Sequence, residues 1–394
     1  MMENPNDALV GSAPTTRVPT SSPLEPLPAG RVASWLATLD AGYFAAVMAT
    51  GIVSIGAGLL GQPVLALVLI WVTAVAFVVL LAAYLARAVR FPRRFAQSLR
   101  EPGTAVSYFT VVAGTNVLAT GLVGRGMWPL ALGMGVAAFA LWLGLTYGLF
   151  CSIVLAGNRP LLREITGVWL VWVVGTQSVA VLAASLAPHL QWPPAKSAAG
   201  SLAVVFWGVG VVLYLIFVVI IFLRLFLIET TPKEMGPAYW ILMGATAISV
   251  RAAAGILSLS QTAPDPLITG MHPFILGLAV VLWSFGGWFI PMLVLFGLWR
   301  YFVRGYSWGY EPKLWSVVFP LGMYTVASLT LGKAADIGFM ESLAGVWVWV
   351  AIAAWFAVTV LLLRCLCRLP AHARSDPFRA LVCAGTSVRT ASLL

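Results

Sequence analysis

The chain has 394 residues, of which 61% are hydrophobic and only 9% are charged. Soluble domains carry about 25% charged residues, so this composition excludes an ordinary soluble fold. The formal net charge is +10, but a nucleic-acid-binding protein gathers such charge on a soluble face and this sequence offers no soluble domain, so no nucleic acid partner is expected.

The two ends of the chain differ from its middle. Residues 1–40 are polar, rich in Pro, Ser and Thr, and lack the apolar core of a signal peptide. We expect a disordered cytoplasmic tail there and a second cytoplasmic tail over residues 367–394. Residues 41–366 between them are predicted to form one transmembrane domain.

Ten apolar stretches fill this middle part. Each is close to or above the roughly 20 residues that cross about 30 Å of hydrocarbon. They lie at residues 41–61, 64–86, 103–123, 128–156, 165–187, 199–228, 237–259, 272–300, 314–332 and 343–366. Strands of an outer-membrane barrel are only about ten residues long. The sequence therefore predicts an all-α integral membrane protein with ten transmembrane helices in contact with lipid.

The basic residues predict the orientation of the chain. Of its 23 Lys and Arg residues, 19 fall in the tails, loops and helix ends on the side of the N-terminus. Three fall on the other side (Arg125, Lys196 and Lys333), and Arg251 lies within a span. Because basic loops stay inside, we expect both termini in the cytoplasm and the protein in the plasma or inner membrane.

Odd-numbered and even-numbered spans have different compositions. The odd ones have small, hydroxylated centres such as MATGIVSIG (48–56), whereas the even ones are bulky, as in VVLYLIFVVIIFL (211–223). This alternation predicts five repeated helical hairpins, with the five odd helices around a central pore and the five even helices facing lipid. The competing interpretation is that the small residues only allow close helix packing.

The predicted pore suits anions better than cations. No Asp or Glu lies in the middle of a span, and cation or proton sites at membrane depth are built from such residues. The sequence also lacks catalytic and metal-binding constellations in its spans, so we expect no enzyme, no metal and no cofactor. The candidate pore-lining residues are Thr50, Gly51, Gly114, Thr115, Gly175, Thr176, Gly244, Thr246, Gly322 and Val326.

Three polar residues within the spans each allow two interpretations. Arg251 lies about two-thirds of the way across the seventh span, where it either attracts anions toward the path or extends its side chain to the outer interface. Asn116 and Gln177 either contact a ligand or form hydrogen bonds between helices.

The ninth span contains VVFPLGMYTVASLTLG (317–332). Pro320 has no backbone N–H, so it removes a helical hydrogen bond and predicts a kink. At 100° per residue, Phe319 shares a helix face with Met323 and Val326. Its ring either occludes a narrow lumen or is packed in the core.

Four segments resemble the tellurite-resistance/dicarboxylate transporter (TDT) family. They are GYFAAVMATGIVSIG (42–56), GTQSVAVLAA (175–184), YWILMGATAIS (239–249) and LWSVVFPLGMYTVASLTLG (314–332). This family includes bacterial TehA proteins, the slow-type anion channels of plant guard cells, and yeast malate and sulfite transporters. The resemblance covers roughly residues 36–368 and implies a homotrimer in which every subunit has its own pore. It also implies that Phe319 is the gate, beside the kink at Pro320.

The resemblance favours a passive or gated anion pathway for chloride, nitrate, sulfite or C4-dicarboxylates such as malate. One alternative is a proton-linked carrier or exporter of dicarboxylate, sulfite or tellurite-related oxyanions, although the lack of intramembrane acids argues against proton coupling through the protein. A second alternative is a membrane scaffold or sensor that transports nothing.

Overall fold

The computed structural model describes residues 31–262, 266–307 and 309–367. Within these residues the chain is helical and has no β-strand. Ten of its described helices are long and apolar enough to cross a membrane, which confirms the ten predicted spans. Most of the two predicted tails (1–30 and 368–394) lies outside the described residues.

One segment of the predicted N-terminal tail is folded. Helix α1 spans Arg31–Thr38. Trp35, Leu36 and the following Leu39 are buried, so this segment packs onto the bundle. The polar composition of the first 40 residues as a whole concealed this short apolar cluster.

The inner spans share one local design. Each begins with a short 3-10 turn that continues into an α-helix. The five pairs are η1 (Ala41–Phe44) with α2 (Ala45–Leu59), η2 (Val106–Tyr108) with α6 (Phe109–Val123), η4 (Gly167–Trp169) with α8 (Leu170–Leu186), η6 (Pro237–Trp240) with α10 (Ile241–Thr262), and η8 (Pro312–Leu314) with α12 (Trp315–Ala335).

The outer spans are longer helices. They are α3 (Pro63–Arg90), α7 (Trp128–Val154), α9 (Pro193–Leu227), α11 (Pro266–Leu298) and α13 (Gly338–Cys367). Shorter connecting elements are α4 (Pro92–Arg100), α5 (Pro102–Ala105), η3 (Leu162–Glu164), η5 (Ala187–His189) and the π-helical turn η7 (Trp299–Val303). Proline begins several of these helices because the first helical position needs no N–H donor.

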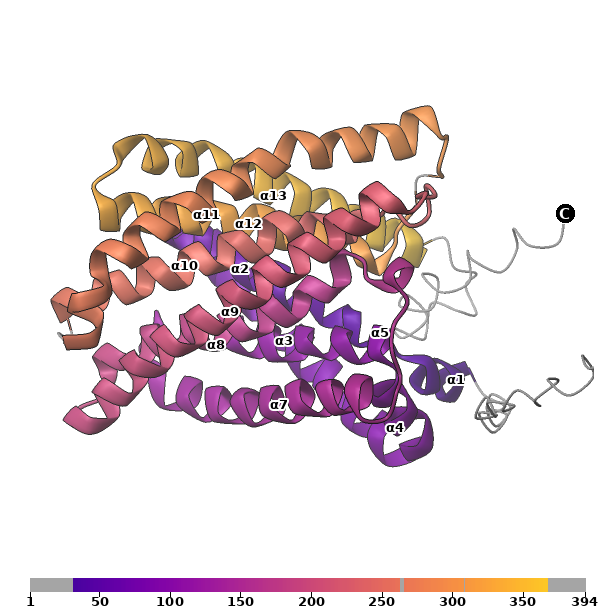
Figure 1. The fold of residues 1–394 in the computed structure, drawn as a ribbon, viewed down its shortest axis with the longest axis horizontal. Coiled ribbons are helices and arrows are strands. Elements are labelled where there is room, and N and C mark those ends of the chain that lie inside the picture. Colours follow the sequence, from indigo (N-terminus) through magenta and orange to yellow (C-terminus); the bar gives the residue numbers. More distant parts are fainter. Residues whose placement is uncertain (1–30, 263–265, 308, 368–394) are drawn as a thin grey trace, which may run out of the picture.

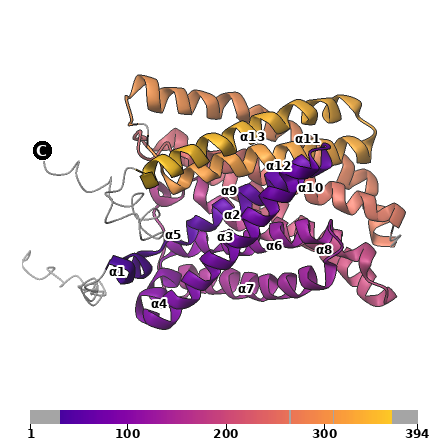
Figure 2. The same cartoon turned by 180° about the vertical axis from the view of Figure 1, so that it is seen from behind.

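Burial alternates along the chain. Between 72% and 94% of the apolar window of each odd span is buried, against at most 50% of each even span. Successive inner helices are in contact, and α12 returns to contact α2, so the five inner helices form a closed ring. The outer helices surround this ring, and α1 and the last turn of α13 lie at the same end of the bundle (Figures 1 and 2). We call this end the terminal end.

Tryptophans of the outer helices are hydrogen-bonded to the ring. The indole N–H groups donate from Trp142 to Thr176 Oγ1 (2.9 Å), from Trp207 to the Ser249 carbonyl (3.1 Å), from Trp283 to Ser328 Oγ (2.8 Å) and from Trp355 to Thr50 Oγ1 (3.0 Å). An indole N–H facing hydrocarbon needs an acceptor, and these inner-helix oxygens supply it. The bond from Trp355 joins the last outer helix to the first inner helix.

Buried arginines at the terminal end fix where the inner helices begin. Arg87, near the end of α3, donates to the Leu39 carbonyl at 2.6 Å and to the Tyr108 hydroxyl at 3.0 Å. Arg300, in η7, forms an ion pair with Glu311 at 2.8 Å. Each therefore ties an outer helix to the segment that starts an inner helix, with charge-assisted hydrogen bonds that are stronger than neutral ones.

Arg224, near the end of α9, has the same role. Its Nε donates to the Arg163 carbonyl at 3.0 Å, and its guanidinium also contacts the Tyr239 hydroxyl and, at 3.5 Å, the carboxylate of Glu234. Arg163 precedes α8 and Tyr239 precedes α10, so one guanidinium joins the starts of two neighbouring inner helices.

Candidate functional site

A small cavity lies inside the ring of inner helices. Its volume is about 20 Å³, enough for one water molecule. Its walls are Ile52 and Ile55 of α2, Asn116, Val117 and Thr120 of α6, Ser178 and Val181 of α8, Ile248 and Arg251 of α10, and Met323 and Val326 of α12. All five inner helices therefore line one space, and none of its described wall residues belongs to an outer helix.

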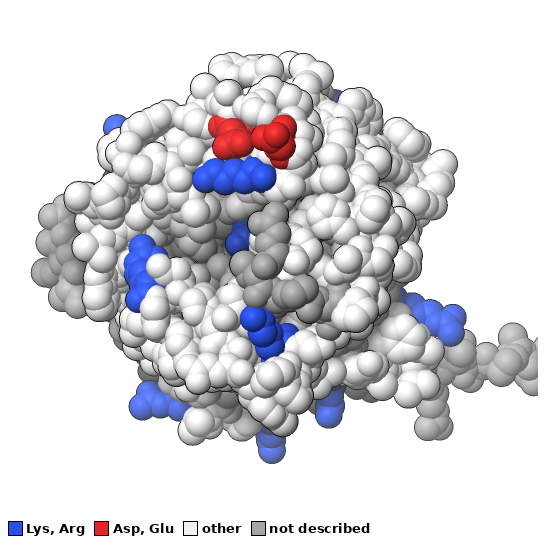
Figure 3. All heavy atoms as spheres, turned by 90° about the vertical axis from the view of Figure 1, so that its left-hand side faces the viewer, with Lys and Arg blue, Asp and Glu red and all other residues white. Residues whose placement is uncertain are grey.

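The cavity lies in the middle of the bundle and toward the end opposite the terminal end. Its α2 residues, Ile52 and Ile55, belong to the second half of a span that starts at Ala41 at the terminal end. The face at the opposite end is hollowed near its centre, and a basic side chain is visible inside the hollow (Figure 3). The cavity is thus on the hollowed side of the ring.

Arg251 is the charged residue of the cavity wall. Within the described part of the chain, it forms no hydrogen bond and no ion pair, and no carboxylate lines the cavity. Gly255, one turn further along α10, leaves room for the guanidinium: a Cβ at that position would lie 3.0 Å from Nη1. Arg251 contributes to the cavity wall, while its Nη1 atom lies beside Gly255, one turn nearer the hollowed end, and the residue is partly exposed.

Two further polar residues of the wall interact across neighbouring helices. Asn116 Nδ2 donates to Ser178 Oγ at 2.9 Å, which joins α6 to α8. The Asn116 side chain is 1% exposed, and its Oδ1 atom has no partner among the described residues. Gln177, in contrast, faces outward and donates to the Trp207 carbonyl of α9 at 3.1 Å. Asn116 therefore lies at the cavity, and Gln177 does not.

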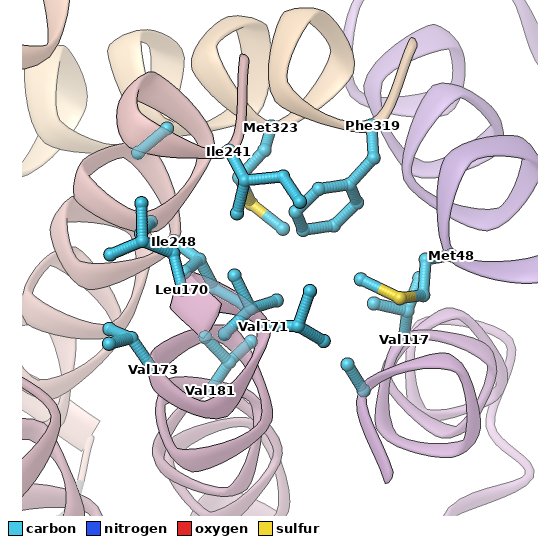
Figure 4. Close-up of a cluster of buried hydrophobic side chains, with 14 of the residues drawn as sticks. Met48, Val117, Leu170, Val171, Val173, Val181, Ile241, Ile248, Phe319 and Met323 are labelled. Carbon is cyan, nitrogen blue, oxygen red and sulfur yellow. The ribbon is translucent and has the colours of Figure 1, made fainter. Parts of the chain in front are cut away.

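Phe319 lies one helical turn nearer the terminal end than Met323, which lines the cavity. The side chain is 2% exposed. Figure 4 shows its ring directed into the space that Met48, Ile241 and Met323 border. These neighbours belong to three inner helices and are all apolar, so Phe319 lies in an apolar cluster between the cavity and the terminal end.

Pro320 faces the neighbouring inner helix. A Cβ built on Gly244 of α10 would lie 2.8 Å from Pro320 Cγ, so the absence of a side chain at Gly244 allows the proline ring to approach. Helix α12 continues through Pro320 from Trp315 to Ala335. The proline therefore sets the packing of α12 against α10 directly beside Phe319.

Nine of the ten candidate pore-lining residues lie outside the cavity wall, and Val326 is in it. The five glycines are at helix contacts, because a Cβ added at any of them would lie 2.8–3.2 Å from a side chain of a neighbouring helix. These neighbours are Val117 for Gly51 (2.8 Å), Phe44 for Gly114 (3.2 Å), Phe109 for Gly175 (3.0 Å), Pro320 for Gly244 (2.8 Å) and Ile52 for Gly322 (2.9 Å). The threonines form hydrogen bonds instead: Thr50 and Thr176 accept from tryptophans, while Thr115 and Thr246 donate to carbonyls of their own helices.

Most of the wall consists of residues that the sequence analysis did not select. Ile52, Val117, Val181 and Ile248 are apolar and β-branched, so in the sequence they cannot be distinguished from core residues. Among the missed residues, Ser178 carries a polar signal, since it follows the conspicuous Gln177 directly.

The comparison with known families agrees with this geometry. The model of the voltage-dependent anion channel family matches residues 38–363, which is most of the chain. The chain belongs to this family. Membership points to anion transport across a membrane, and to a channel or transporter rather than an enzyme.

Individual relatives support the same assignment. The chain is 43% identical over 140 residues to an uncharacterized membrane protein of Mycobacterium tuberculosis strain H37Rv, which covers 36% of this chain and 70% of that protein. It is 25% identical to two uncharacterized transporters of Methanocaldococcus jannaschii, over 314 and 336 residues. These two alignments cover 75% and 81% of this chain, and 85% and 90% of the relatives.

Proposed function

We propose that the protein conducts anions through the ring of inner helices and that Phe319 gates this path. The observation that carries the proposal is the cavity inside the ring, to which all five inner helices contribute and in whose wall Arg251 lies without a counterion among the described residues. An arginine in a water-accessible path attracts anions and repels cations. The described carboxylates lie in loops or near helix ends, so they do not oppose this selectivity.

The gate acts by excluding water. An anion that reaches the apolar constriction of Phe319, Met48 and Ile241 must lose its hydration shell, and these side chains offer no hydrogen-bond donor in return. Hydrophobic constrictions close channels in this way, by dewetting. Rotation of one ring, or movement of α12 at Pro320, opens the path without breaking the ring of helices.

Orientation and assembly are part of the proposal. The basic residues favour a cytoplasmic terminal end and a plasma or inner membrane location, so the cavity would open toward the outside. The family resemblance supports a homotrimer with one pore per subunit. Chloride, nitrate, sulfite and C4-dicarboxylates are the anions to compare in a flux assay.

The test is anion flux into proteoliposomes for wild type and Phe319→Ala. We expect the variant to raise flux severalfold because removal of the ring widens the constriction. Phe289→Ala is the matched control: Phe289 is fully buried on α11 and packs against aromatic residues of α9 and α11, away from the cavity. Equal flux in Phe319→Ala and wild type would refute the gate, and no flux for any anion in either protein would refute conduction.

The proton-linked carrier predicts a different response. Its flux saturates and follows an imposed pH gradient, whereas the proposed pathway follows the electrochemical gradient of the anion alone. The cavity wall contains no Asp, Glu or His among the described residues, and such groups form proton relays at membrane depth. Flux measured with the pH gradient reversed at constant membrane potential separates the two mechanisms.

A further inference from the structure

We propose that a groove between α4 and the terminal end of α7 binds one anionic phospholipid from the bilayer leaflet at that end. The groove has a volume of about 870 Å³ and shares no wall residue with the cavity inside the ring. Helix α4 lies beside the end of α7 in both views of the fold (Figures 1 and 2). The proposal does not depend on anion conduction, because it concerns the lipid-facing side of the bundle.

Specific contacts hold the wall of the groove in place. A hydrogen bond of 2.8 Å between Ser98 Oγ and the Tyr108 hydroxyl joins α4 to the start of the α6 span. The ring of Phe95 packs edge-on against Tyr108, with ring centroids 5.7 Å apart. Ser152 Oγ, on α7, donates to the Arg100 carbonyl at 2.8 Å. The groove is therefore a built feature of the fold.

The groove extends from the membrane surface into the hydrocarbon. Along α7 its wall runs from Ala140 to Leu155, which at 1.5 Å per residue is about 22 Å. One leaflet contains only about 15 Å of hydrocarbon, so the part lined by Gly144 and Gly148 lies at the depth of acyl chains. A Cβ added at either glycine would meet no other group within 4 Å, so the space beside them is open. An occupant must be apolar along most of its length and polar only at the terminal end.

The width of the groove favours acyl chains over a helix of another chain. A volume of about 870 Å³ over a length of about 22 Å gives a mean cross-section of about 40 Å². A helix with its side chains is about 10–12 Å in diameter, which is a cross-section of about 80–110 Å². Hydrocarbon chains pack at carbon–carbon contacts of about 4 Å, so the two chains of one phospholipid fit side by side. Because the spacing of Ala140, Gly144 and Gly148 also occurs where helices pack together, a second copy of the chain is the occupant that the test must separate from lipid.

Helix α4 has the residue pattern of a helix at the membrane interface. Phe95 and Leu99 line the groove, whereas Arg93 and Gln97 are exposed. A helix with one apolar side and one cationic side lies at the boundary between headgroups and acyl chains. The end of the groove at α4 is therefore at headgroup level.

The charge at this end selects an anionic headgroup. Residues 90–101 include four arginines and one carboxylate, that of Glu101. Arg100 belongs to the groove wall, and its exposed guanidinium forms no ion pair with the described residues. Basic residues at a membrane surface attract anionic lipids. A zwitterionic headgroup would bring its own cation close to these arginines, where like charges repel.

The test counts lipids bound to the purified full chain in detergent by native mass spectrometry, during titration with dioleoyl phosphatidylglycerol or dioleoyl phosphatidylcholine. Gly148→Leu fills the groove, and the open space at this position lets the variant fold. Gly133→Leu is the matched control, since Gly133 is an exposed glycine of α7 with equally open surroundings outside the groove wall. Arg100→Gln removes the charge at the groove, and Lys313→Gln removes an exposed charge elsewhere at the terminal end.

We expect wild type, Gly133→Leu and Lys313→Gln to bind one phosphatidylglycerol per chain, at lower lipid concentrations than phosphatidylcholine. Gly148→Leu should lose this bound lipid, together with the rise in unfolding temperature that phosphatidylglycerol gives the wild type. Arg100→Gln should weaken phosphatidylglycerol binding about 5-fold, the usual effect of one basic residue near an anionic lipid surface, and leave phosphatidylcholine binding unchanged.

Two results would overturn the proposal directly. One is equal affinity of the wild type for the two lipids, and the other is the same number of bound phosphatidylglycerol molecules in Gly148→Leu and Gly133→Leu. The mass of the complex also reports how many chains it contains. If Gly148→Leu reduced the number of chains per complex and kept its bound lipid, the groove would be the contact of a second copy, and the lipid proposal would be wrong.

Discussion

Replacing Gly244 by alanine tests the packing that positions the gate. The new Cβ would lie 2.8 Å from Pro320 Cγ and 3.4 Å from Pro320 Cα. A proline ring fused to the backbone cannot rotate away, so α10 and α12 must separate by about half an ångström to restore van der Waals contact. Overpacking of this kind costs about 1–3 kcal/mol.

The higher helix propensity of alanine offsets part of this loss of stability. Alanine is favoured over glycine in a helix interior by about 1 kcal/mol, which reduces the net loss for Gly244→Ala to about 0–2 kcal/mol. Gly277→Ala on α11 provides the reference because Gly277 is exposed and a Cβ there meets no other group. The two variants share the propensity gain, so the difference between them, about 1–3 kcal/mol, isolates the clash.

The assay is unfolding in mixed detergent micelles, followed by tryptophan fluorescence, for wild type and both variants. We expect Gly244→Ala to unfold at lower denaturing-detergent fractions than Gly277→Ala. Because Pro320 adjoins Phe319, separation of α10 from α12 should also increase anion leak in proteoliposomes. If Gly244→Ala proves as stable as Gly277→Ala and its leak matches wild type, the contact does not position α12 and this reasoning is wrong.

Two other contacts give further predictions. Trp355→Phe removes the indole N–H that donates to α2 and should lower the free energy of unfolding by about 0.6–2 kcal/mol, whereas Trp349→Phe at an exposed position of the same helix should change it little. The backbone N–H of Thr231 is the main cause that lowers the pKa of Glu234 from its ordinary value of 4.5. A lowered pKa in the folded state means that ionised Glu234 stabilises the fold above this value and that the stabilisation is lost as the pH falls. At pH 7 we therefore expect Glu234→Gln to unfold at a lower temperature than wild type, since Arg224 loses its counterion. The unfolding temperatures of the two proteins should converge as the pH falls below 4.5. A difference in unfolding temperature that does not change with pH would contradict this assignment.

The transmembrane architecture was readable from the sequence. The ten spans, and the division into buried odd and exposed even helices, were predicted from apolar length and residue size, and the structure confirms both. The physical reason is local: hydrocarbon requires about 20 apolar residues per helix, and lipid-facing surfaces tolerate bulky side chains that tightly packed helices do not.

The cavity wall differs from the set of candidate pore-lining residues. The small and hydroxylated residues suggested a polar lining, but Gly51 and Gly322 lie at helix contacts, and Thr50 and Thr176 accept hydrogen bonds from outer-helix tryptophans. The competing interpretation, close helix packing, describes these positions. Arg251 is both a candidate from the sequence and a residue of the cavity wall, and its role in attracting anions stays a prediction.

The sequence by itself determined how many times the chain crosses the membrane, which helices are buried, and which family the ninth-span motif resembles, because composition and length act within each segment. Only the tertiary structure decided which face of each buried helix borders the cavity. Between 72% and 94% of the apolar window of each inner helix is buried, so hydrophobicity does not distinguish a residue that lines the cavity from one that packs beside it. That distinction depends on the rotation of five helices about one axis, which glycine contacts and tryptophan hydrogen bonds set between segments far apart in the chain.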